Sequence, residues 1–506
     1  MKLLVRSLSV DSREPFAVLH RNDCLSIGVD VEDRVRIGGR HSAVLPIMMS
    51  DQPSMDGSVF VSQSVMERFG LTEGEMADVV YSPPPETIIA IKKKIDGLEL
   101  DGEEIGSIVS DINEGLLTER EILSFVSAFN VSNASITEVA DLTRAMASTG
   151  TTVDFGTEEV FDFHSLGGIP GNKITPIVVS IVASKGIVIP KLSSRAISSA
   201  CGTSDFVETF CDVELGPERL KDIIATTGGV FACGNTEYAP VGKEIIRAER
   251  PMGIDPRPMM LASIMSKKVA LGVKDLLIDI PLGTGSKIQN MDVAEGFSDD
   301  LIALGNELGI RLECVVTNAE QPIGRTIGPV LEAWECIKAL EDGKGDETLI
   351  EKACSMAGIL LEMAGIEDGI SVAKESFESG LAHKKFLEIV KAQGGPEDLR
   401  SSDLKKSEFS KDVHAKRDGY VQYIDNQCMV AIAKGAGAPF DTKAGIELLH
   451  KKGDYVKEGE VLFRIYADNQ AKLDRATESA RSRRPMCVLP EKEGLERKPT
   501  ILNRFR

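Results

Sequence analysis

Two glycine-rich loops on either side of one apolar stretch constrain this chain more than any other feature. The first reads DFHSLGGIPGNK over Asp162–Lys173, and the second reads PKLSSRAISSACGTSD over Pro190–Asp205. Glycine lets the backbone approach a ligand closely, and successive N–H groups at the start of a helix form a nest for an anion. The loops therefore predict a phosphate site, with one helix-length segment between them.

Hydroxyl and basic side chains in both loops support this prediction, because both kinds donate hydrogen bonds to phosphate oxygens. The hydroxyls are those of Ser165, Ser193, Ser194, Ser198, Ser199 and Thr203, and the basic residues are His164, Lys173, Lys191 and Arg195. Histidine titrates near neutrality, which makes His164 a candidate for acid–base work as well. A lone histidine is more often structural, so both interpretations of His164 stay open.

The two loops resemble those of the nucleoside phosphorylase family that includes thymidine and pyrimidine nucleoside phosphorylases. FHSLGGIPGNK is similar to the family's KHSTGG or KHSIGGVPGNK, and SSRAISSACGTSD resembles the archaeal AMP phosphorylases more than the bacterial thymidine enzymes. DPRPMMLASIMSKK (Asp255–Lys268) resembles the family's base-binding helix, and DIPLGTGSK (Asp279–Lys287) resembles its loop after a core strand. The resemblance extends over nearly all 506 residues.

The residue patterns and the resemblance together predict a multidomain α/β protein. The β-rich runs of residues 1–84 suggest a small barrel, and they end at Pro83–Pro85, a triple proline that favours an extended linker. The resemblance implies that this barrel is the additional N-terminal domain of AMP phosphorylases. The predicted domains are a β-barrel-like domain (1–84), a helical domain (86–150 and about 240–272), a mostly parallel α/β phosphate-binding domain (151–405 without 240–272), a C-terminal β-rich half-barrel domain (410–467) and a tail (471–506).

Local patterns place helices and strands within this outline. Apolar residues recur at helical spacing from Ile105 to Ile112, and Thr118 with Glu121 forms a candidate capping box. Leu276–Ile280 has the composition of a buried strand, as has Val230–Ala232, and both suit a mostly parallel sheet.

The C-terminal residues suggest a structural role. Lys452–Ile465 resembles a half-barrel of the lipoyl or biotinyl type but lacks a lysine between methionines that a carrier domain would present. For the tail, two interpretations stay open. It is either a solvated segment or a segment that docks on a neighbouring subunit.

Charge and composition exclude several classes of function. The net charge of 58 − 78 = −20 argues against DNA or another polyanion as a partner. Nine cysteines without a CxxC pair, and six histidines without paired spacing, predict neither a disulfide framework nor a metal site and favour a reducing compartment. No run reaches 18 apolar residues. We therefore expect a cytoplasmic protein that contacts neither nucleic acid nor membrane.

The candidate general acid is Asp255. Phosphorolysis of an N-glycosidic bond requires a proton for the departing base, and the resemblance places an aspartate here, just before the base-binding helix. An aspartate titrates near ~3.9 in water, so it must be desolvated to stay protonated. The apolar neighbours Met252, Ile254, Met259 and Met260 make this feasible. The alternative is an Asp-Pro turn or an N-cap of the following helix.

The resemblance also implies contacts with nucleotide and phosphate in each of the four stretches. Ser263 and Lys267 stand four residues apart, so they share one face of a helix, where the family contacts the base. Lys287 matches a nucleotide ligand and is a candidate partner of the 5′-phosphate. The remaining implied contacts are Ser165, Gly168, Ser194, Arg195, Ala196, Ile197, Ser198, Ser199 and Thr203.

The activity that the resemblance implies is phosphorolysis of AMP, and also of CMP and UMP, to ribose 1,5-bisphosphate and free base. It implies a pentosyltransferase without a cofactor, for which phosphate is a substrate, and self-association into a dimer or a larger homo-oligomer. Two alternatives stay open: a thymidine or pyrimidine nucleoside phosphorylase, and a degenerate paralog that binds nucleotide. Two departures support the last of these. Phe163 replaces the family's lysine, and Phe231–Pro240 (FACGNTEYAP) replaces a WGGALNLAP-like sequence.

Overall fold

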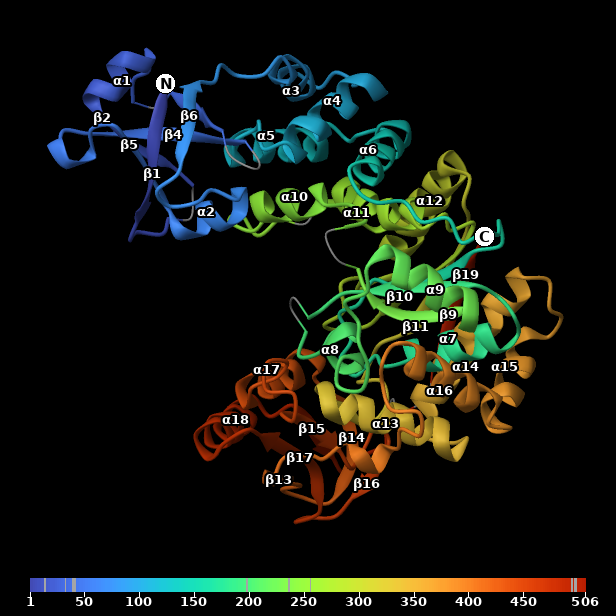
Figure 1. Ribbon diagram of the computed structural model, residues 1–506. Coiled ribbons are helices and arrows are strands. Elements are labelled where there is room, and N and C mark those ends of the chain that lie inside the picture. Colours follow the sequence, from blue (N-terminus) through green and yellow to red (C-terminus); the bar gives the residue numbers. More distant parts are fainter. Residues whose placement is uncertain are drawn as a thin grey trace. The chain divides into compact units, whose positions relative to one another are not determined.

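The computed structural model describes residues 1–12, 15–31, 33–38, 42–196, 199–234, 237–254, 256–492, 495 and 498–506. The chain divides into two compact units, Met1–Thr152 with Thr236–Ala270 and Val153–Asn235 with Leu271–Arg506 (Figure 1). The smaller unit is therefore built from two separate stretches of the chain.

A closed β-barrel begins the smaller unit and confirms the barrel predicted there. Its strands are β1 (Lys2–Leu8), β2 (Ala17–His20), β3 (Arg34–Ile37), β4 (Ala43–Ser50), β5 (Ser58–Ser62) and β6 (Met76–Tyr81), connected in part by α1 (Arg21–Ile27), the 3-10 helix η1 (Pro53–Met55) and α2 (Gln63–Phe69). They pair in the order β1-β5-β2-β4-β3-β6. Alternate residues such as Leu3 and Val5 are fully buried, since successive side chains of a strand point to opposite faces.

Helices form the rest of the smaller unit. They are α3 (Thr87–Ile95), α4 (Gly102–Asn113), α5 (Glu119–Val131), α6 (Ile136–Ser148), α10 (Val241–Glu249) and α11 (Arg257–Ala270). The apolar stripe from Ile105 to Ile112 is the buried face of α4, as its spacing predicts. The predicted capping box of Thr118 and Glu121 is present at the start of α5. Both helices of the second stretch pack onto this bundle, α10 against α4 and α5, and α11 against α5 and α6.

A mostly parallel sheet forms the centre of the larger unit. Its strands are β7 (Phe161–Ser165), β8 (Ile189–Ser193), β9 (Gly229–Cys233), β10 (Asp275–Leu282), β11 (Arg311–Asn318) and β19 (Ile501–Phe505). β7, β10 and β11 pair in parallel, and β19 joins β11 antiparallel. The parallel pair β8 and β9 continues the sheet beyond β7 through a parallel bridge between Val160 and Val188. The predicted buried strands Val230–Ala232 and Leu276–Ile280 lie within β9 and β10.

Helices pack around this sheet. They are α7 (Thr175–Ser184), α8 (Thr203–Val207), α9 (Pro217–Thr227), α12 (Met291–Leu308), α13 (Pro329–Asp342), α14 (Glu347–Met363), α15 (Gly369–Glu378), α16 (Leu381–Ala392) and the 3-10 helix η2 (Ser401–Asp403). The helix between the two glycine-rich loops, α7, has apolar residues on every side and is buried along almost its whole length. Its core cluster includes Phe161 and Phe163 of β7, Leu277 of β10 and residues of α14. This packing fixes the strand ends from which the loops emerge.

The C-terminal domain combines strands with two helices and is not purely β. One sheet has the order β12-β15-β17-β13 and the other β16-β14-β18. Its elements are β12 (Thr326–Ile327), β13 (Phe409–His414), β14 (Gly419–Ile424), α17 (Asn426–Ala436), β15 (Gly445–Leu448), β16 (Tyr455–Val456), β17 (Val461–Ala467), α18 (Gln470–Arg483) and β18 (Met486–Leu489).

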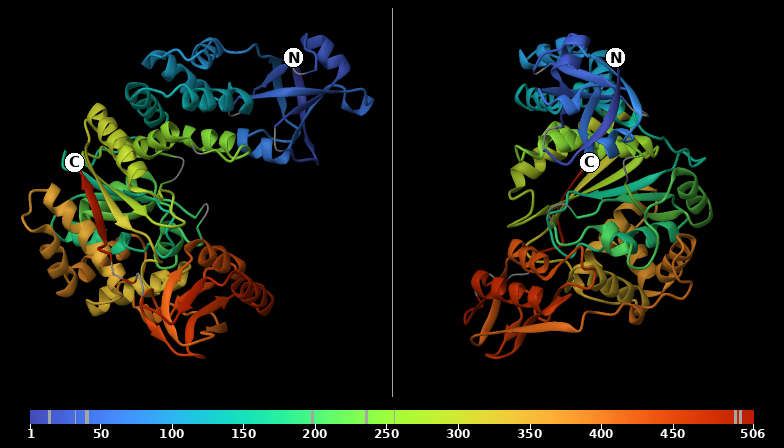
Figure 2. Two further views of the ribbon diagram at one scale, coloured as in Figure 1. Left: turned by 180° about the vertical axis from the view of Figure 1, so that it is seen from behind. Right: turned by 60° about the vertical axis from the view of Figure 1, so that its left-hand side comes forward.

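The tail differs from both interpretations that the sequence left open. α18 and β18 belong to the C-terminal domain, and β19 returns to the central sheet, where Arg504 forms ion pairs with Glu313 and Glu362 at 2.6 Å each. Figure 2 shows this last strand, in red, beside the central sheet and apart from the orange C-terminal domain. The physical reason is that β11 would otherwise present a row of unpaired backbone groups at the edge of the sheet.

Candidate active site

Three glycine-rich loops leave the carboxyl ends of neighbouring parallel strands. The first loop follows β7 at Ser165, the second follows β8 at Ser193, and Gly283–Lys287 follows β10. Because these strands are parallel, all three loops emerge at the same edge of the sheet. The fold thus brings together stretches that lie more than a hundred residues apart in the chain.

The order of the strands reverses between β7 and β10. From β7 the chain moves outward through β8 to β9, and then returns to the opposite side of β7 for β10 and β11. In open α/β sheets, ligands bind outside the carboxyl ends of the strands at such a reversal. The first loop and the loop after β10 stand on its two sides, which makes this edge the candidate site.

Gly168 and Lys287 meet at this reversal. Gly168 is exposed and has a φ of +88°, and a Cβ built on it would lie 3.0 Å from the backbone nitrogen of Lys287. A side chain would therefore be strained at this position and would push the two loops apart. Lys287 is exposed as well. Two residues that the sequence singled out in separate motifs are neighbours in space.

Ser165, at the end of β7, is held from three sides. Its Oγ donates a hydrogen bond to Asp279 Oδ2 at 2.7 Å, and it accepts hydrogen bonds from Asn172 Nδ2 at 3.2 Å and from the backbone N–H of Gly167 at 3.4 Å. The hydroxyl thus closes the first loop upon itself and ties it to β10.

The second loop folds around the carboxylate of Asp205. Asp205 Oδ2 accepts hydrogen bonds from the backbone N–H groups of Ala196 and Gly202, each at 2.8 Å. A Cβ on Gly202 would lie 2.5 Å from the backbone nitrogen of Ala196, so this turn requires glycine. The other predicted contacts of this loop within the described residues are the exposed Ser194, the half-buried Ser199 and Thr203, which begins α8.

Most of the positive charge predicted for phosphate is already paired within the protein. Lys173 is fully buried, with its Nζ 3.0 Å from Glu335 Oε2, and the buried Lys191 lies 3.8 Å from Asp162 Oδ1. Arg195 forms ion pairs with two exposed carboxylates. For the two lysines the physical reason is that a buried cation requires a partner.

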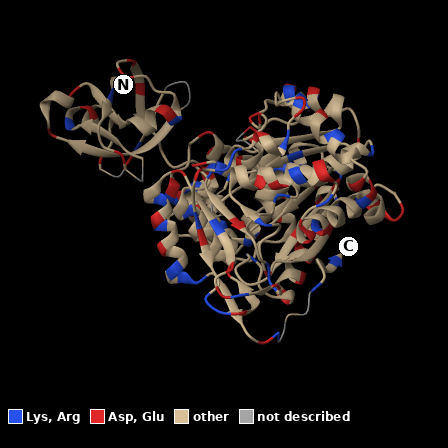
Figure 3. Cartoon of the chain, turned by 90° about the horizontal axis from the view of Figure 1, so that it is seen from below, with Lys and Arg blue, Asp and Glu red and all other residues tan. Residues whose placement is uncertain are grey.

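The carboxylates beside Arg195 are Glu208, at 2.5 Å, and Glu214, at 2.9 Å. They raise the pKa of its guanidinium, the Glu208 hydrogen bond most strongly. The same mixing of charge extends over the larger unit, where Figure 3 shows acidic and basic residues interspersed along the helices.

His164 and Phe163 are neighbours in β7 and therefore point to opposite faces of the sheet. Phe163 is 1% exposed and belongs to the core cluster with α7 and α14. Lys191 Nζ lies 5.0 Å from the centroid of its ring. His164 is half-buried and pairs in register with Ile278 of β10. The position at which the family resemblance places a lysine is thus part of the core in this chain.

Ser263 and Lys267 lie on α11 of the smaller unit and share one face, as their spacing predicts. Lys267 Nζ donates a hydrogen bond to the backbone oxygen of Ser263 at 3.2 Å. Burial lowers the pKa of Lys267 to about 8, and the charge of Lys268 adds to this shift. A lysine with this pKa is partly neutral in weakly alkaline solution.

Three of the predicted site residues, Asp255, Ile197 and Ser198, lie outside the described residues. Within the described part of the chain, no three His, Cys, Asp or Glu side chains gather as metal ligands would. A search of the same residues for a helix long and apolar enough to span a membrane also finds none.

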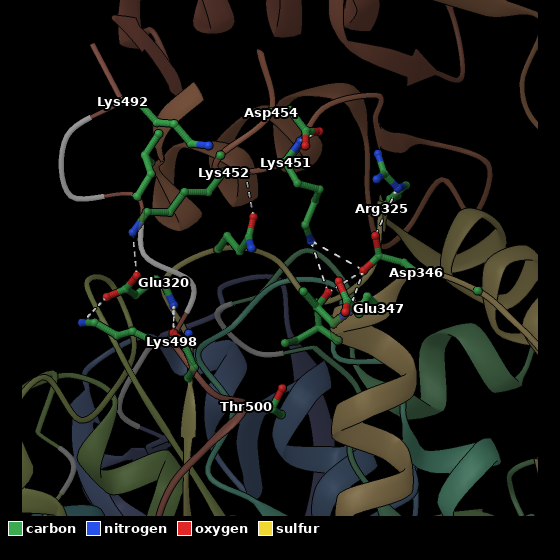
Figure 4. A pocket seen from close by; sticks show the side chains of 17 residues that line it. Glu320, Arg325, Asp346, Glu347, Lys451, Lys452, Asp454, Lys492, Lys498 and Thr500 are labelled. Carbon is green, nitrogen blue, oxygen red and sulfur yellow. Dashed lines mark hydrogen bonds and ion pairs between the residues drawn. The ribbon is translucent and has the colours of Figure 1, made fainter. Parts of the chain in front are cut away.

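A cavity of about 590 Å³ lies at the carboxyl end of β11, between the central sheet, the C-terminal domain and the tail (Figure 4). Glu320 pairs there with Lys452 at 2.6 Å and with Lys498 at 2.5 Å. Arg325 pairs with Asp346 at 3.1 Å. Among the described site residues predicted from the sequence, none lines this cavity. Lys452, Lys498 and Arg325 are each held in an ion pair with a carboxylate of the same cavity. We therefore do not assign the predicted phosphate site to it.

The structure adds residues that the sequence did not single out as part of the site. Asp279 and Asp205 each stand within a motif that the sequence did identify, so their place in the motif is a signal that could have found them. Lys352 of α14 carries no such signal, because its ion pair with Asp279 joins residues 73 positions apart (352 − 279 = 73).

Comparison with protein families matches successive parts of the chain. A family model described as "Glycosyl transferase family, helical bundle domain" matches residues 89–150. One described as "Glycosyl transferase family, a/b domain" matches residues 157–383. A third, "Pyrimidine nucleoside phosphorylase C-terminal domain", matches residues 420–486.

Three curated relatives are similar along almost their whole length. AMP phosphorylase of Thermococcus kodakarensis is 42% identical over 492 residues, which cover 96% of this chain and 98% of the relative. AMP phosphorylase 1 of Archaeoglobus fulgidus is 40% identical over 474 residues, 93% of this chain and 94% of the relative. AMP phosphorylase of Methanocaldococcus jannaschii is 40% identical over 492 residues, with 96% and 97% covered.

Among solved structures, anthranilate phosphoribosyltransferase of Thermus thermophilus resembles this chain with a TM-score of 0.52 and 18% sequence identity. The alignment covers 60% of this chain and 99% of that one. At this identity the likeness shows a shared fold for part of the chain.

Proposed function

The chain belongs to the AMP phosphorylase family, and from this premise we propose that it cleaves AMP with inorganic phosphate to adenine and ribose 1,5-bisphosphate. As a member of this family the chain is a pentosyltransferase. The observation that supports the proposed reaction most directly is the meeting of the first loop and the loop after β10 at the strand-order reversal.

The loops suit a reaction in which positioning supplies most of the acceleration. Holding two reactants in line contributes on the order of 7–11 kcal/mol, whereas a placed general acid contributes roughly 10²–10⁴-fold. We assign phosphate to the exposed backbone at Gly168, between the first loop and Lys287. In this assignment Lys287 supplies an exposed cation directly beside Gly168.

The second loop is assigned to the nucleotide. Ser194, Ala196, Ser199 and Thr203 lie on a turn that Asp205 shapes from within. Arg195 then stabilises this turn through Glu208 and Glu214, and its backbone N–H remains a candidate phosphate donor. The assignment extends to Ile197 and Ser198 through the sequence motif alone.

The base and its proton are assigned to the stretch that begins at Asp255. Asp255 donates the proton to the departing base in this proposal, and Ser263 and Lys267 contact the base from one face of α11. His164 is retained as a second candidate for proton transfer. These roles rest on the sequence motif and on the position of Ser263 and Lys267 along α11.

Substrate range, cofactor need and assembly complete the proposal. The reaction exchanges a C–N bond for a C–O bond at C1′ without electron transfer, so it needs no redox cofactor, and phosphate enters as a substrate. We propose AMP as the main substrate, CMP and UMP as further ones, and a homo-oligomer as the active form. All nine cysteines are free thiols, which suits a reducing compartment such as the cytoplasm.

Product analysis tests this proposal. The purified full chain is incubated with AMP, CMP or UMP, with and without phosphate, and the free base is separated by chromatography. We expect base release from AMP that depends on phosphate. Release from none of these nucleotides would leave the degenerate paralog as the better interpretation.

A further inference from the structure

A buried polar network stands directly behind the first loop. At its centre, Asp279 of β10 is completely buried. Its Oδ2 lies 2.7 Å from Lys352 Nζ and accepts the hydrogen bond of Ser165 Oγ at 2.7 Å. Its Oδ1 accepts a hydrogen bond from Thr317 Oγ1 at 2.5 Å. The carboxylate is therefore bonded on both oxygens.

Lys352 balances this charge from α14. It is also completely buried, and its Nζ donates a second hydrogen bond to Thr317 Oγ1 at 3.0 Å. A buried ion pair generally adds little stability, because removing two charges from water costs about as much as their attraction returns. The presence of the pair is therefore weak evidence for a purely stabilising role. Its hydrogen bond to Ser165 in the first loop points to a role in that loop instead.

The network reaches the loop through two consecutive residues. Ser165 donates its one hydroxyl proton to Asp279, and the backbone N–H of Leu166 donates to the backbone oxygen of Asp279 at 3.0 Å. Immediately afterwards Gly167 and Gly168 adopt positive φ angles of 76° and 88°. Asp279 thus fixes the chain at the point where it turns outward to the candidate phosphate site.

We propose that Asp279 and Lys352 are positioning residues of the phosphate loop, and that Ser165 acts as the anchor between them and the loop. This rests on the proposed function. The hydroxyl proton of Ser165 is engaged by Asp279, so the loop binds phosphate through its backbone N–H groups, and the buried pair sets their geometry.

The consequence is a specific pattern of kinetic defects. Misplacing a reacting group by about 1 Å costs roughly 10²-fold in rate, so loosening the anchor affects phosphate more than AMP. We expect Ser165→Ala to raise the KM for phosphate by roughly tenfold or more on this basis, with a smaller change in the KM for AMP. A role in fold stability alone would lower the melting temperature without this split.

A double-mutant cycle separates anchoring from direct phosphate binding. Ser165→Ala is measured in the wild-type chain and in the charge-neutral background Asp279→Asn/Lys352→Gln, with kcat and both KM values determined at saturating co-substrate. If Ser165 acts through Asp279, its replacement has little further effect in that background. An equal loss of phosphate affinity in both backgrounds would overturn the proposal, because Ser165 would then bind phosphate independently.

Three additional variants keep the test decisive if the neutral background folds poorly. Thr317→Val removes one hydrogen bond to Asp279 and one from Lys352 while retaining the shape, and its position on β11 lies outside the loop. We expect it to raise the KM for phosphate several-fold, with rescue by Thr317→Ser. Glu138→Gln is the matched control, since Glu138 forms a buried pair with Lys94 at 2.5 Å in the smaller unit. It should lower the melting temperature and leave the KM for phosphate unchanged.

The wild-type chain distinguishes failure of this proposal from failure of the proposed function. A wild type that converts AMP, with Thr317→Val and Ser165→Ala unchanged in their KM for phosphate, would refute the positioning role alone. A wild type without turnover would refute the proposed function. Inorganic phosphate titrated calorimetrically into the same variants would then test the positioning role, with weaker binding expected and unchanged binding contradicting it.

Discussion

At the scale of one residue, the surroundings of Phe163 favour an apolar side chain at this core position. The ring lies in the core cluster, and Lys191 approaches its face. Lys191 already places one ammonium group beside this ring. Its charge is compensated by Asp162 at 3.8 Å and by a hydrogen bond to the backbone oxygen of Leu192 at 2.7 Å. A second ammonium at position 163 would have no comparable partner.

We therefore expect Phe163→Lys to destabilise the protein rather than to improve phosphate binding. An uncompensated buried charge costs on the order of 3–5 kcal/mol of unfolding free energy. Chemical denaturation measures this loss, and Phe163→Leu is the control that keeps the position apolar and should lose less. A lysine variant with wild-type stability and a lower KM for phosphate would contradict this account.

Lys267 carries a second consequence at this scale, through its depressed pKa. The folded protein releases this proton near pH 8, because burial lowers the pKa to about 8, whereas the unfolded chain retains it up to the ordinary value of 10.5. Between these values the unfolded state binds more protons, so the contribution of Lys267 to stability rises with pH. Below about pH 8 the buried charge is a fixed cost.

Melting temperatures measured from pH 7 to pH 10 test this expectation, with Lys267→Met as the reference. The difference between the wild type and the variant isolates this one group. The melting temperature of the wild type should rise relative to that of the variant as the pH increases above about 8. A difference that stays constant over this range would mean that Lys267 titrates normally.

The sequence singles out candidate site residues where a motif contains them. Gly168 and Lys287 were singled out in two motifs, and their contact in space supports reading both as parts of one site. The ion-pair partners Glu208, Glu214 and Glu335 could not be found in this way. The tertiary fold decides which carboxylate lies beside a loop cation, and this leaves no periodic signal in the sequence.

At the scale of single elements, β19 completes the central sheet at the edge of β11. It covers the outer edge of β11 and is held by Arg504, whose guanidinium bridges Glu313 and Glu362. Without this strand, β11 would expose a row of backbone donors and acceptors, which is a template for pairing with another chain.

Removing residues 501–506 should therefore lower the melting temperature and promote aggregation, both measurable by thermal scanning with light scattering. Arg506→Ala is the matched control. Arg506 is itself largely exposed in its ion pair with Glu313, and pairs at the surface contribute about 0–1 kcal/mol. A truncated chain that melts and scatters like the full chain would show that β19 is dispensable.

Elements with a strong local pattern were predictable, and those that depend on a distant partner were not. Residue spacing predicts the apolar stripe of α4 and the capping box at the start of α5. Composition predicts the buried strands β9 and β10. β12, with two residues, is too short to carry a pattern, and β19 (ILNRF) has Asn503 beside Arg504, so it shows neither strict alternation nor an unbroken apolar run. Both become strands only because β15 and β11 provide an edge.

At the scale of the whole molecule, the N-terminal barrel is joined to the helices of its own unit by ion pairs. Arg34 of β3 contacts Glu121 at 2.7 Å, and Arg68 of α2 pairs with Glu244 of α10. On the described part of the barrel, Leu25, Met48 and Met76 are exposed apolar residues. These features suit a domain that stabilises assembly rather than one that takes part in the chemistry.

A chain that begins near Glu86 should accordingly form a smaller oligomer than the full chain. Light scattering coupled to size-exclusion chromatography measures the two masses, and circular dichroism checks that the truncated chain keeps its helices. The reason for the expectation is the loss of the exposed apolar surface together with the barrel. An unchanged number of subunits would assign assembly to other parts of the molecule.

The central claim is that the loops bind inorganic phosphate together with a nucleotide whose 5′-phosphate lies at the second loop, and comparison of AMP with adenosine tests it most directly. A charge-assisted hydrogen bond is worth ~1.5–3 kcal/mol, so loss of one such contact lowers kcat/KM by roughly 10–150-fold. The account predicts that the full chain, at saturating phosphate, converts AMP with a kcat/KM higher than that for adenosine by at least this factor. Equal values for the two substrates would contradict it and identify a nucleoside phosphorylase instead.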